Sequence, residues 1–291
     1  MALTLRVEVL GRLPGVVAVV AATATLGCLA DDHHAEYLVE RADAVRGGLL
    51  WDRFWEVPDV REPVEPGAVA VVDGTGALLQ SASSLPVDNP LYLDNPAANQ
   101  RRGADTWRCA ECHGWDYLGE AGEYGRNSHR TGFPGVWSAR KRDVGELFEV
   151  IAEGGPGHTF TPVLSNQDIA DVVKFVREGT VHRDEFVHGP GIAHGVAARG
   201  QSRFEMHCVG CHGDDGRQIN LAEGEVGWRG IGDVGLEEPG RFVHKVRLGQ
   251  PDGSMPSARA INLRHDDVSD LLTYAQALGQ LQQGQQRRVR P

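Results

Sequence analysis

The chain has 291 residues, of which 41% are hydrophobic and 24% charged, with a formal net charge of −11. This length suits about two domains, and these fractions exclude a polytopic membrane protein and a wholly disordered chain. The excess of acidic residues argues against nucleic acid or an anionic membrane as the main partner. Five cysteines are too few for a disulfide scaffold, and 37 glycines indicate a fold rich in loops.

Residues 1–28 have the pattern of a secretory signal peptide. Arg6 and Arg12 precede an uncharged run from Gly15 to Leu26, and the sequence turns polar at Asp31. The run is too short to span a bilayer comfortably. The alternative is a buried amphipathic helix. We expect export, to the periplasm or to a membrane surface that faces it.

Cys28 lies where cleavage of a lipoprotein signal would leave an N-terminal cysteine. The preceding residues 25–27 resemble a lipobox, although Leu26 sits one position later than usual. The sequence leaves two alternatives open. Either Cys28 carries a lipid anchor, which would be the chain's only membrane contact, or it is removed with the signal peptide.

Residues 29–100 contain no cysteine and form an N-terminal extension. Residues 37–54 have apolar side chains at near-helical spacing and predict a partly helical segment. Residues 69–74 resemble a short strand that enters a turn. We expect the extension to pack against the domain that follows it, through Trp51, Phe54 and Trp55.

Two short strings, CAECH at 109–113 and CVGCH at 208–212, contain the other four cysteines. Both are C-x-x-C-H, the attachment signature of c-type haem. Two thiols at this spacing can each add to one vinyl group of the porphyrin, and the adjacent histidine then ligates the iron. The predicted attachment residues are Cys109, Cys112, Cys208 and Cys211, and the predicted proximal ligands are His113 and His212.

Two other uses of cysteine pairs fit less well. A thioredoxin-like pair needs one copy and no following histidine. A zinc ribbon separates its pairs by about 15–20 residues, whereas Cys112 and Cys208 are 96 positions apart. Two copies of the motif in an exported chain therefore favour haem attachment.

With these motifs the chain resembles a diheme cytochrome c with two class I-like domains in tandem, over roughly residues 100–280. The resemblance implies an all-α fold of two small, loop-rich domains and two covalently attached haem c groups. It also implies export, because haem is attached outside the cytoplasm in that family. We place the first domain at 101–182, a linker at 183–193, the second domain at 194–280 and a mobile tail at 281–291.

An internal repeat supports two related domains. From the first cysteine of each motif to an aromatic residue is 66 positions, ending at Phe175 and at Tyr274. Each aromatic residue lies in an apolar-periodic stretch that opens at Asp168 or Asp267, which predicts an amphipathic C-terminal helix in each domain. Ser165 and Asp168 predict a capping box on the first of these helices.

The ends and the packing of these helices are also predicted. Gly179 and Gly279 are expected to end the two C-terminal helices. Gly200-x-x-x-Phe204 resembles the N-terminal cytochrome helix, which crosses the C-terminal helix at a close glycine–aromatic contact. Gly103-x-x-x-Trp107 is the candidate for the same contact in the first domain.

Met255 is the predicted distal ligand of the second haem. It lies in Gly253-Ser254-Met255-Pro256, a loop that resembles the distal-methionine loop of class I cytochromes. The chain has three methionines, and the other two are Met1, in the signal peptide, and Met206, on the wrong side of the motif.

The first domain has no methionine, so its distal ligand must be another residue. Met255 lies 47 positions after Cys208, and His158 lies 49 positions after Cys109. His158 is therefore the first candidate and His129 the second. The remaining alternatives are another histidine and an open, water-bound iron.

We expect an exported carrier of single electrons between a protein donor and a protein acceptor. One alternative is a diheme oxidoreductase, peroxidase-like or oxidising sulfur compounds, with the first haem as the catalytic centre. A third interpretation is an electron-transfer subunit of a membrane respiratory complex. The sequence favours a carrier over an enzyme, because no cluster of acid, base or additional cysteine defines a catalytic pocket.

Overall fold

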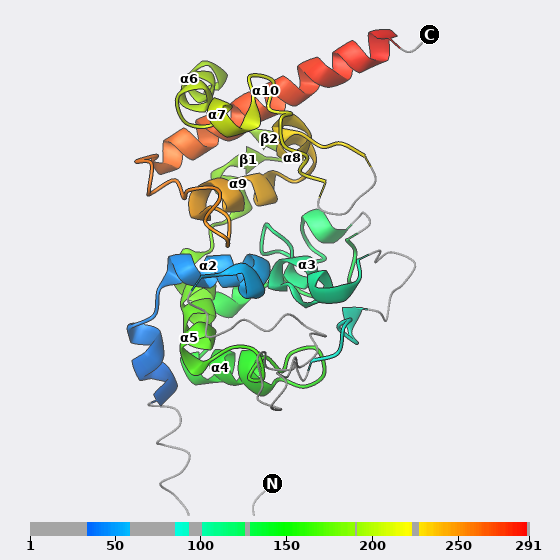
Figure 1. Cartoon of the computed structure of the whole chain (residues 1–291). Coiled ribbons are helices and arrows are strands. Elements are labelled where there is room, and N and C mark those ends of the chain that lie inside the picture. The colour runs from blue at the N-terminus through cyan, green and yellow to red at the C-terminus, as the bar shows by residue number, and fades with distance from the viewer. Residues whose placement is uncertain are drawn as a thin grey trace, which may run out of the picture.

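The computed structural model describes 34–58, 85–92, 101–125, 129–189, 191–222 and 227–289. The expected export signal and the expected strand at 69–74 lie outside these residues. Two lobes make up the described structure (Figure 1). The first lobe contains helices α2 to α5, and the second lobe runs from strand β1 to helix α10.

Helices dominate both lobes, which confirms the all-α expectation. The first lobe has α2 (Ala44–Arg53), α3 (Cys109–His113), α4 (Val144–Glu153) and α5 (Asn166–Lys174), which continues into a π-helical turn (Phe175–Gly179). Residues 34–40 are also helical. The second lobe has β1 (Val187–His188), β2 (Ile192–Ala193), α6 (Ala197–His207), α7 (Val209–His212), α8 (Ile231–Glu237), α9 (Pro239–Leu248) and α10 (His265–Val289). Short 3-10 segments are Phe54–Glu56, Gly103–Trp107, Glu123–Gly125, Ser138–Lys141 and Arg183–Glu185.

The predicted capping box begins α5. The Asp168 backbone N–H donates to the Ser165 hydroxyl over 3.2 Å, and the Ser165 backbone N–H donates to the Asp168 carboxylate over 2.8 Å. These bonds satisfy amide groups that the first helical turn leaves without a partner. In the second lobe the Arg264 N–H donates to Asp267 over 2.9 Å, just before the corresponding helix.

The predicted glycine crossing is present in the second lobe, where α6 packs on α10. A Cβ placed on Gly200 would lie 2.0 Å from the carbonyl oxygen of Asp270, so only glycine allows this approach. The rings of Phe204 and Tyr274 lie beside it, with centroids 5.4 Å apart. The expectation for Gly200 and Phe204 is confirmed.

The corresponding expectation for Gly103 and Trp107 is wrong. They form a 3-10 segment, and a Cβ on Gly103 would meet nothing within 4 Å. Helix α2 makes the crossing instead, because a Cβ on Gly47 would lie 1.9 Å from the carbonyl oxygen of Asp171. The N-terminal extension therefore supplies the crossing helix of the first lobe.

Aromatic packing completes the crossing of α2 and α5. Trp51 packs on Phe175 with ring centroids 5.7 Å apart. Gly47 and Trp51 have the same four-residue spacing as the glycine and phenylalanine of α6. Trp51 and Phe54 are buried, which confirms that the extension packs on the first lobe.

Ion pairs reinforce both crossings. In the first lobe, Arg46 of α2 bonds Asp168 over 2.6 Å and also contacts Asp171 of α5. In the second lobe, Arg199 of α6 bonds Asp270 of α10 over 2.6 Å. The aspartates are almost fully buried at their positions on the C-terminal helices, whereas the arginines reach them from the surface side.

The second lobe differs from the sequence expectations at its C-terminal helix. Gly279 does not end it, because α10 runs on to Val289, into the segment 281–291 that was expected to be a mobile tail. A Cβ on Gly279 would lie 2.5 Å from the carbonyl oxygen of Gly232, so this glycine permits contact with α8. The residues after Gly279 include good helix formers such as Gln and Leu, which extend the helix.

The expected linker contains regular structure. Strands β1 and β2 pair antiparallel, with Val187 opposite Ala193. Phe186 and Val187 are buried in the core of the second lobe. The segment expected to be a linker therefore contributes side chains to the core of the second lobe.

In the described part of the chain, no helix has both the length and the apolar character needed to cross a membrane.

Replacing Gly47 with alanine should destabilise the protein, because the added Cβ overlaps the backbone of α5. We expect a loss of about 1–3 kcal/mol in the free energy of unfolding, the usual effect of overpacking. Gly284→Ala is the matched control, since its Cβ would meet nothing within 4 Å. The control should keep or gain stability through helix propensity. Denaturant unfolding measures both, and equal stability of the two variants would contradict the role of Gly47.

Candidate haem sites

The first motif helix, α3, lines a cavity of about 970 Å³. Cys109, Cys112 and His113 face it from one side, and His158 from the loop after α4. Helices α2, α4 and α5 contribute apolar side chains to the wall, including Trp51, Leu147, Val150, Ile151 and Val172, and the segments at 106–108 and 134–142 also line it. The predicted attachment cysteines, the proximal histidine and the first distal candidate therefore meet at one cavity.

Hydrogen bonding and burial fix the state of His113. Its Nδ1 lies 2.7 Å from the carbonyl oxygen of Pro134, so Nδ1 carries a proton and donates it. Burial lowers the pKa of His113 to about 4, so the ring is neutral at pH 7. A neutral imidazole with its proton on Nδ1 has a lone pair on Nε2, which is the form that binds iron.

His158 is held in the same way. Its Nδ1 donates to the carbonyl oxygen of Val150 over 2.9 Å, which leaves Nε2 with a lone pair. The ring centroids of His113 and His158 are 5.8 Å apart, and the ring planes are nearly perpendicular at 86°. The two histidines thus face one another inside one cavity.

His129 is bound elsewhere. Its Nδ1 lies 2.9 Å from a carboxylate oxygen of Glu111, and its ring stacks on Tyr124 at 4.8 Å. It is buried and is not among the residues that line the first cavity. The structure therefore brings His158, and not His129, beside His113; the iron ligand itself stays a prediction.

The second motif helix, α7, lines a cavity of about 630 Å³ together with α9. Cys208, His212 and Met255 are among its lining residues, whereas Cys211 is solvent-exposed. The buried Nδ1 of His212 has no hydrogen-bond partner among the described residues. Burial lowers the pKa of His212, which favours its neutral form.

The loop that contains Met255 depends on a glycine. Gly249 ends α9 with a φ of 89°, which a residue with a side chain rarely adopts. Its Cβ would lie 2.4 Å from the carbonyl oxygen of Met255. The Gln250 N–H donates to that oxygen over 3.0 Å, so the turn places Met255 at the cavity.

The four motif cysteines form no disulfide. Burial raises the pKa of Cys109 to about 12 and that of Cys208 to about 11, and it raises the pKa of Cys112 as well. These thiols are therefore neutral at pH 7. Both thiols of the first motif line its cavity, whereas at the second cavity Cys208 lines the wall and Cys211 is exposed beside it. With a neutral imidazole and a largely apolar wall at each, the two sites fit covalent haem c.

The fold and the two cavities define cytochrome c-type domains, which bind covalent haem c and serve haem-based electron transfer. A family model described as cytochrome c matches residues 100–180. A second, described as cytochrome C oxidase, cbb3-type, subunit III, matches residues 195–274. No similar protein was found among curated proteins or solved structures.

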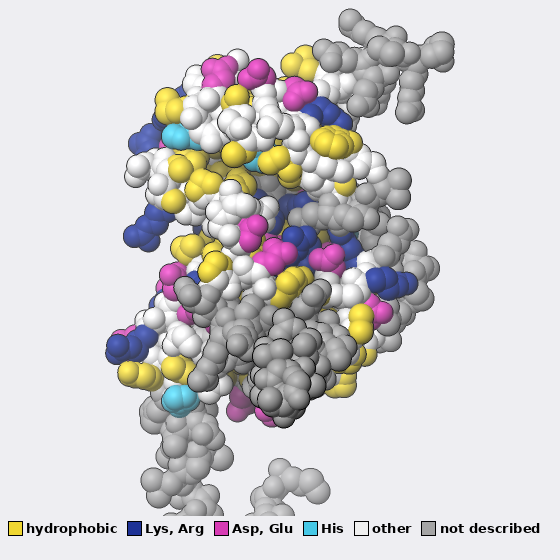
Figure 2. Space-filling model, viewed as in Figure 1, with side chains coloured by type: hydrophobic (Ala, Val, Ile, Leu, Met, Phe, Trp, Pro, Cys, Tyr) yellow, Lys and Arg dark blue, Asp and Glu magenta, His cyan; other side chains and the backbone are white. Residues whose placement is uncertain are grey.

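The lobes meet in a buried seam that the sequence did not predict. Figure 2 shows acidic and basic side chains side by side near the middle of the visible face. A buried aromatic cluster, which includes Trp51 and Tyr117, also contains Leu248 of α9. The only related sequence pattern is the four-residue spacing of Gly47 and Trp51 in α2, because Trp51 belongs to this cluster.

Tyr117 joins the lobes by a hydrogen bond. Its φ is 63°, a strained value for a bulky residue. Its hydroxyl lies 2.9 Å from Nδ1 of His244, whose Nε2 donates to the carbonyl oxygen of Gly48 over 3.1 Å. Burial lowers the pKa of His244 to about 3, so the ring is neutral, and its Nδ1 accepts from Tyr117.

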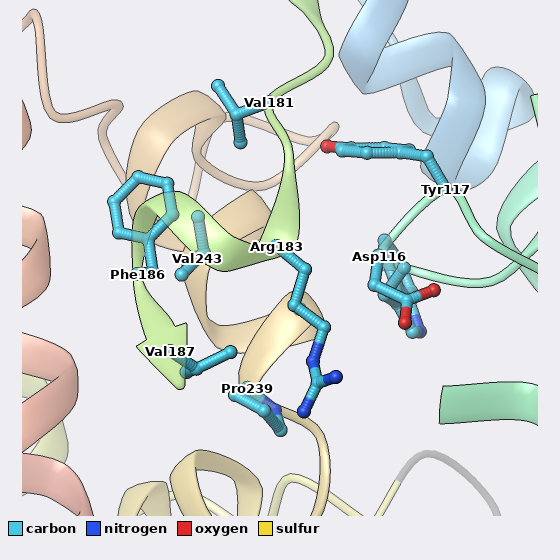
Figure 3. A pocket seen from close by; sticks show the side chains of 10 residues that line it. Asp116, Tyr117, Val181, Arg183, Phe186, Val187, Pro239 and Val243 are labelled. Atoms are coloured by element: carbon cyan, nitrogen blue, oxygen red, sulfur yellow. The ribbon is translucent and has the colours of Figure 1, made fainter. Parts of the chain in front are cut away.

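Two carboxyl groups are buried beside this contact. Figure 3 shows Asp116 and Tyr117 on one side of a small pocket, facing Arg183 and Pro239. Glu123 accepts from the Gly240 N–H over 2.8 Å, and its second oxygen is buried without a partner among the described residues. Burial raises the pKa of Asp116 and, more strongly, that of Glu123, and their mutual repulsion adds to the rise for Glu123.

Glu123 should therefore make stability depend on pH. Above its ordinary pKa of 4.5 the unfolded chain loses the proton while the folded chain keeps it. The free energy of unfolding should then fall as pH rises, by at most about 1.4 kcal/mol per pH unit for one group. Glu123→Gln should flatten this decline above pH 4.5 in denaturant titrations. An unchanged slope would mean that Glu123 ionises normally in the folded protein.

Proposed function

We propose that the protein is an exported diheme c-type cytochrome that carries single electrons between a protein donor and a protein acceptor. The observation that carries the proposal is the pairing inside each cavity. In the first cavity His113 faces His158, and in the second His212 shares the wall with Met255. Two occupied axial positions suit electron transfer, because the iron changes charge without binding a substrate.

Haem c supplies a one-electron iron couple at each site when bound. In this proposal the chain provides the axial ligands and the thioether anchors, and it excludes water by apolar walls. The hydrogen bonds from His113 and His158 to backbone carbonyls hold both rings in one tautomer. Such bonds orient a ligand and make it more basic.

The two sites should differ in potential. Axial ligands can move the potential of haem over about 0.8 V, and methionine favours the higher end. With a histidine pair at the first site and a histidine–methionine pair at the second, electrons would rest at the second site. The signal-like sequence at residues 1–28 supports export, which places the donor and acceptor outside the cytoplasm.

Replacing Met255 with alanine should lower the second midpoint potential and leave the first nearly unchanged. The physical reason is the loss of the thioether ligand at one iron only. A redox titration followed in the visible spectrum measures both midpoints. Met206→Ala is the control, because Met206 is an exposed residue outside both cavity walls. Two equal midpoints in the unaltered protein would contradict the proposed asymmetry.

Replacing His158 with alanine should open the first iron to external ligands. The reduced variant should bind carbon monoxide rapidly at one haem, whereas the unaltered protein should not. His129→Gln is the matched control, since His129 is bound to Glu111 away from the cavity. Rapid binding in the control and not in the His158 variant would reverse the assignment.

The same measurement addresses the enzyme alternative, a diheme oxidoreductase with its catalytic centre at the first haem. This alternative is supported by the residue opposite His113, which is a histidine, His158, and not a methionine. Rapid, stoichiometric carbon monoxide binding to one haem of the unaltered protein would favour catalysis over simple transfer.

The third function is electron transfer within a membrane respiratory complex. The match of residues 195–274 to the model described as cytochrome C oxidase, cbb3-type, subunit III favours it. A lipid on Cys28 would keep such a subunit at the membrane. Co-purification with a membrane complex after detergent extraction would support this function, whereas recovery only as a free protein would favour the carrier.

A further inference from the structure

Asp52 lines neither cavity, but it contacts one lining residue of each. It belongs to α2 and is 1% exposed. Its carboxylate accepts a hydrogen bond from Nη2 of Arg108 over 2.5 Å and contacts the ammonium group of Lys245. Arg108 lines the first cavity, and Lys245 lines the second. One buried carboxylate thus contacts a cation from each site.

The two cations are held firmly around Asp52. Nε of Arg108 also donates to the backbone oxygen of Asp52 over 3.0 Å, so the guanidinium group is fixed at two points. The ring of Trp115 packs beside both cations, with its centroid 5.1 Å from Cζ of Arg108 and 5.4 Å from Nζ of Lys245. Lys245 bonds Gln250 over 2.6 Å as well.

Two cations and one carboxylate meet in this buried group. Charges in a buried region are screened less by water and salt than charges on the surface. Asp105, which lies 3.5 Å from Arg108, is 32% exposed in its side chain and more strongly screened. A change of charge in the Asp52 group is therefore weakly screened from both cavities, because Arg108 lines one and Lys245 lines the other.

We propose that Asp52 couples the two haem sites electrostatically, so that a change of charge in the wall of one site shifts the potential of the other. The inference rests on the proposed diheme function. Reduction of iron removes one positive charge, so added positive charge nearby raises the midpoint and removed positive charge lowers it. Lys245 should accordingly influence the first site, although it lines only the second cavity.

A charge series tests this in the haem-loaded protein. Lys245→Met removes one positive charge from the group, Asp52→Asn removes one negative charge, and the double variant restores the original total. Relative to the unaltered protein, both midpoints should fall in Lys245→Met, rise in Asp52→Asn and return in the double variant. We expect each single variant to change the one-electron equilibrium constant of the first site by about tenfold, which corresponds to about 59 mV.

Lys174→Met is the matched control. Lys174 pairs with the exposed Glu178 over 2.9 Å and lines neither cavity, so both midpoints should stay nearly unchanged. If Asp52→Asn does not fold, Lys245→Met alone decides, because it leaves Asp52 paired with Arg108. Circular dichroism and haem stoichiometry verify each preparation.

The outcomes separate the two proposals. Two resolved midpoints of which only the second responds to Lys245→Met would overturn the coupling and leave the diheme function intact. The coupling would also be overturned if the double variant kept the raised midpoints of Asp52→Asn instead of returning to those of the unaltered protein. One haem per chain in the unaltered protein would overturn the proposed function, and the coupling with it.

Discussion

Each lobe depends on one place where two helices touch without a side chain between them. Gly47 of α2 lies against the backbone of α5, and Gly200 of α6 lies against the backbone of α10. At both positions the two backbones come so close that no Cβ fits. This contact sets the position of the helix that carries the apolar wall of the cavity. In each lobe an arginine of the crossing helix pairs with buried aspartates of the partner helix. The close contact and the ion pairs together fix the frame in which the motif helix lies.

The sequence predicted the second lobe better than the first. There, the crossing helix, the motif and the methionine loop follow one another closely, so spacing from the cysteines located them all. In the first lobe the crossing helix precedes the motif by more than 50 positions. Counting back from Cys109 therefore selected Gly103, a residue of a 3-10 segment. The glycine–aromatic spacing of α2 was present in the sequence, but no local rule connects it to so distant a motif.

The sequence indicated which residues belong to the candidate sites, but not the groups that surround and hold them. Cys109, Cys112, His113 and His158 line one cavity, and Cys208, His212 and Met255 line the other. The backbone partners of the histidines were not predictable, because carbonyl groups carry no sequence signal. The same holds for the seam, where Tyr117 in a left-handed conformation reaches His244. Contacts between lobes arise from the shape of two folded surfaces and leave no periodic pattern. Gly279 shows a related limit, since a glycine can mark either a helix end or a close approach.

Helix α2 contains two adjacent glycines, Gly47 and Gly48, each unfavourable by about 1 kcal/mol relative to alanine in a helix. Ten residues with this composition are too short and too weak to form a stable helix alone. Docking on α5 at Gly47, and contact with Leu248 of the second lobe at Gly48, must therefore stabilise it. The segment becomes helical only as both lobes assemble around it. Folding of one lobe is consequently linked to folding of the other, and the chain should unfold as one cooperative unit.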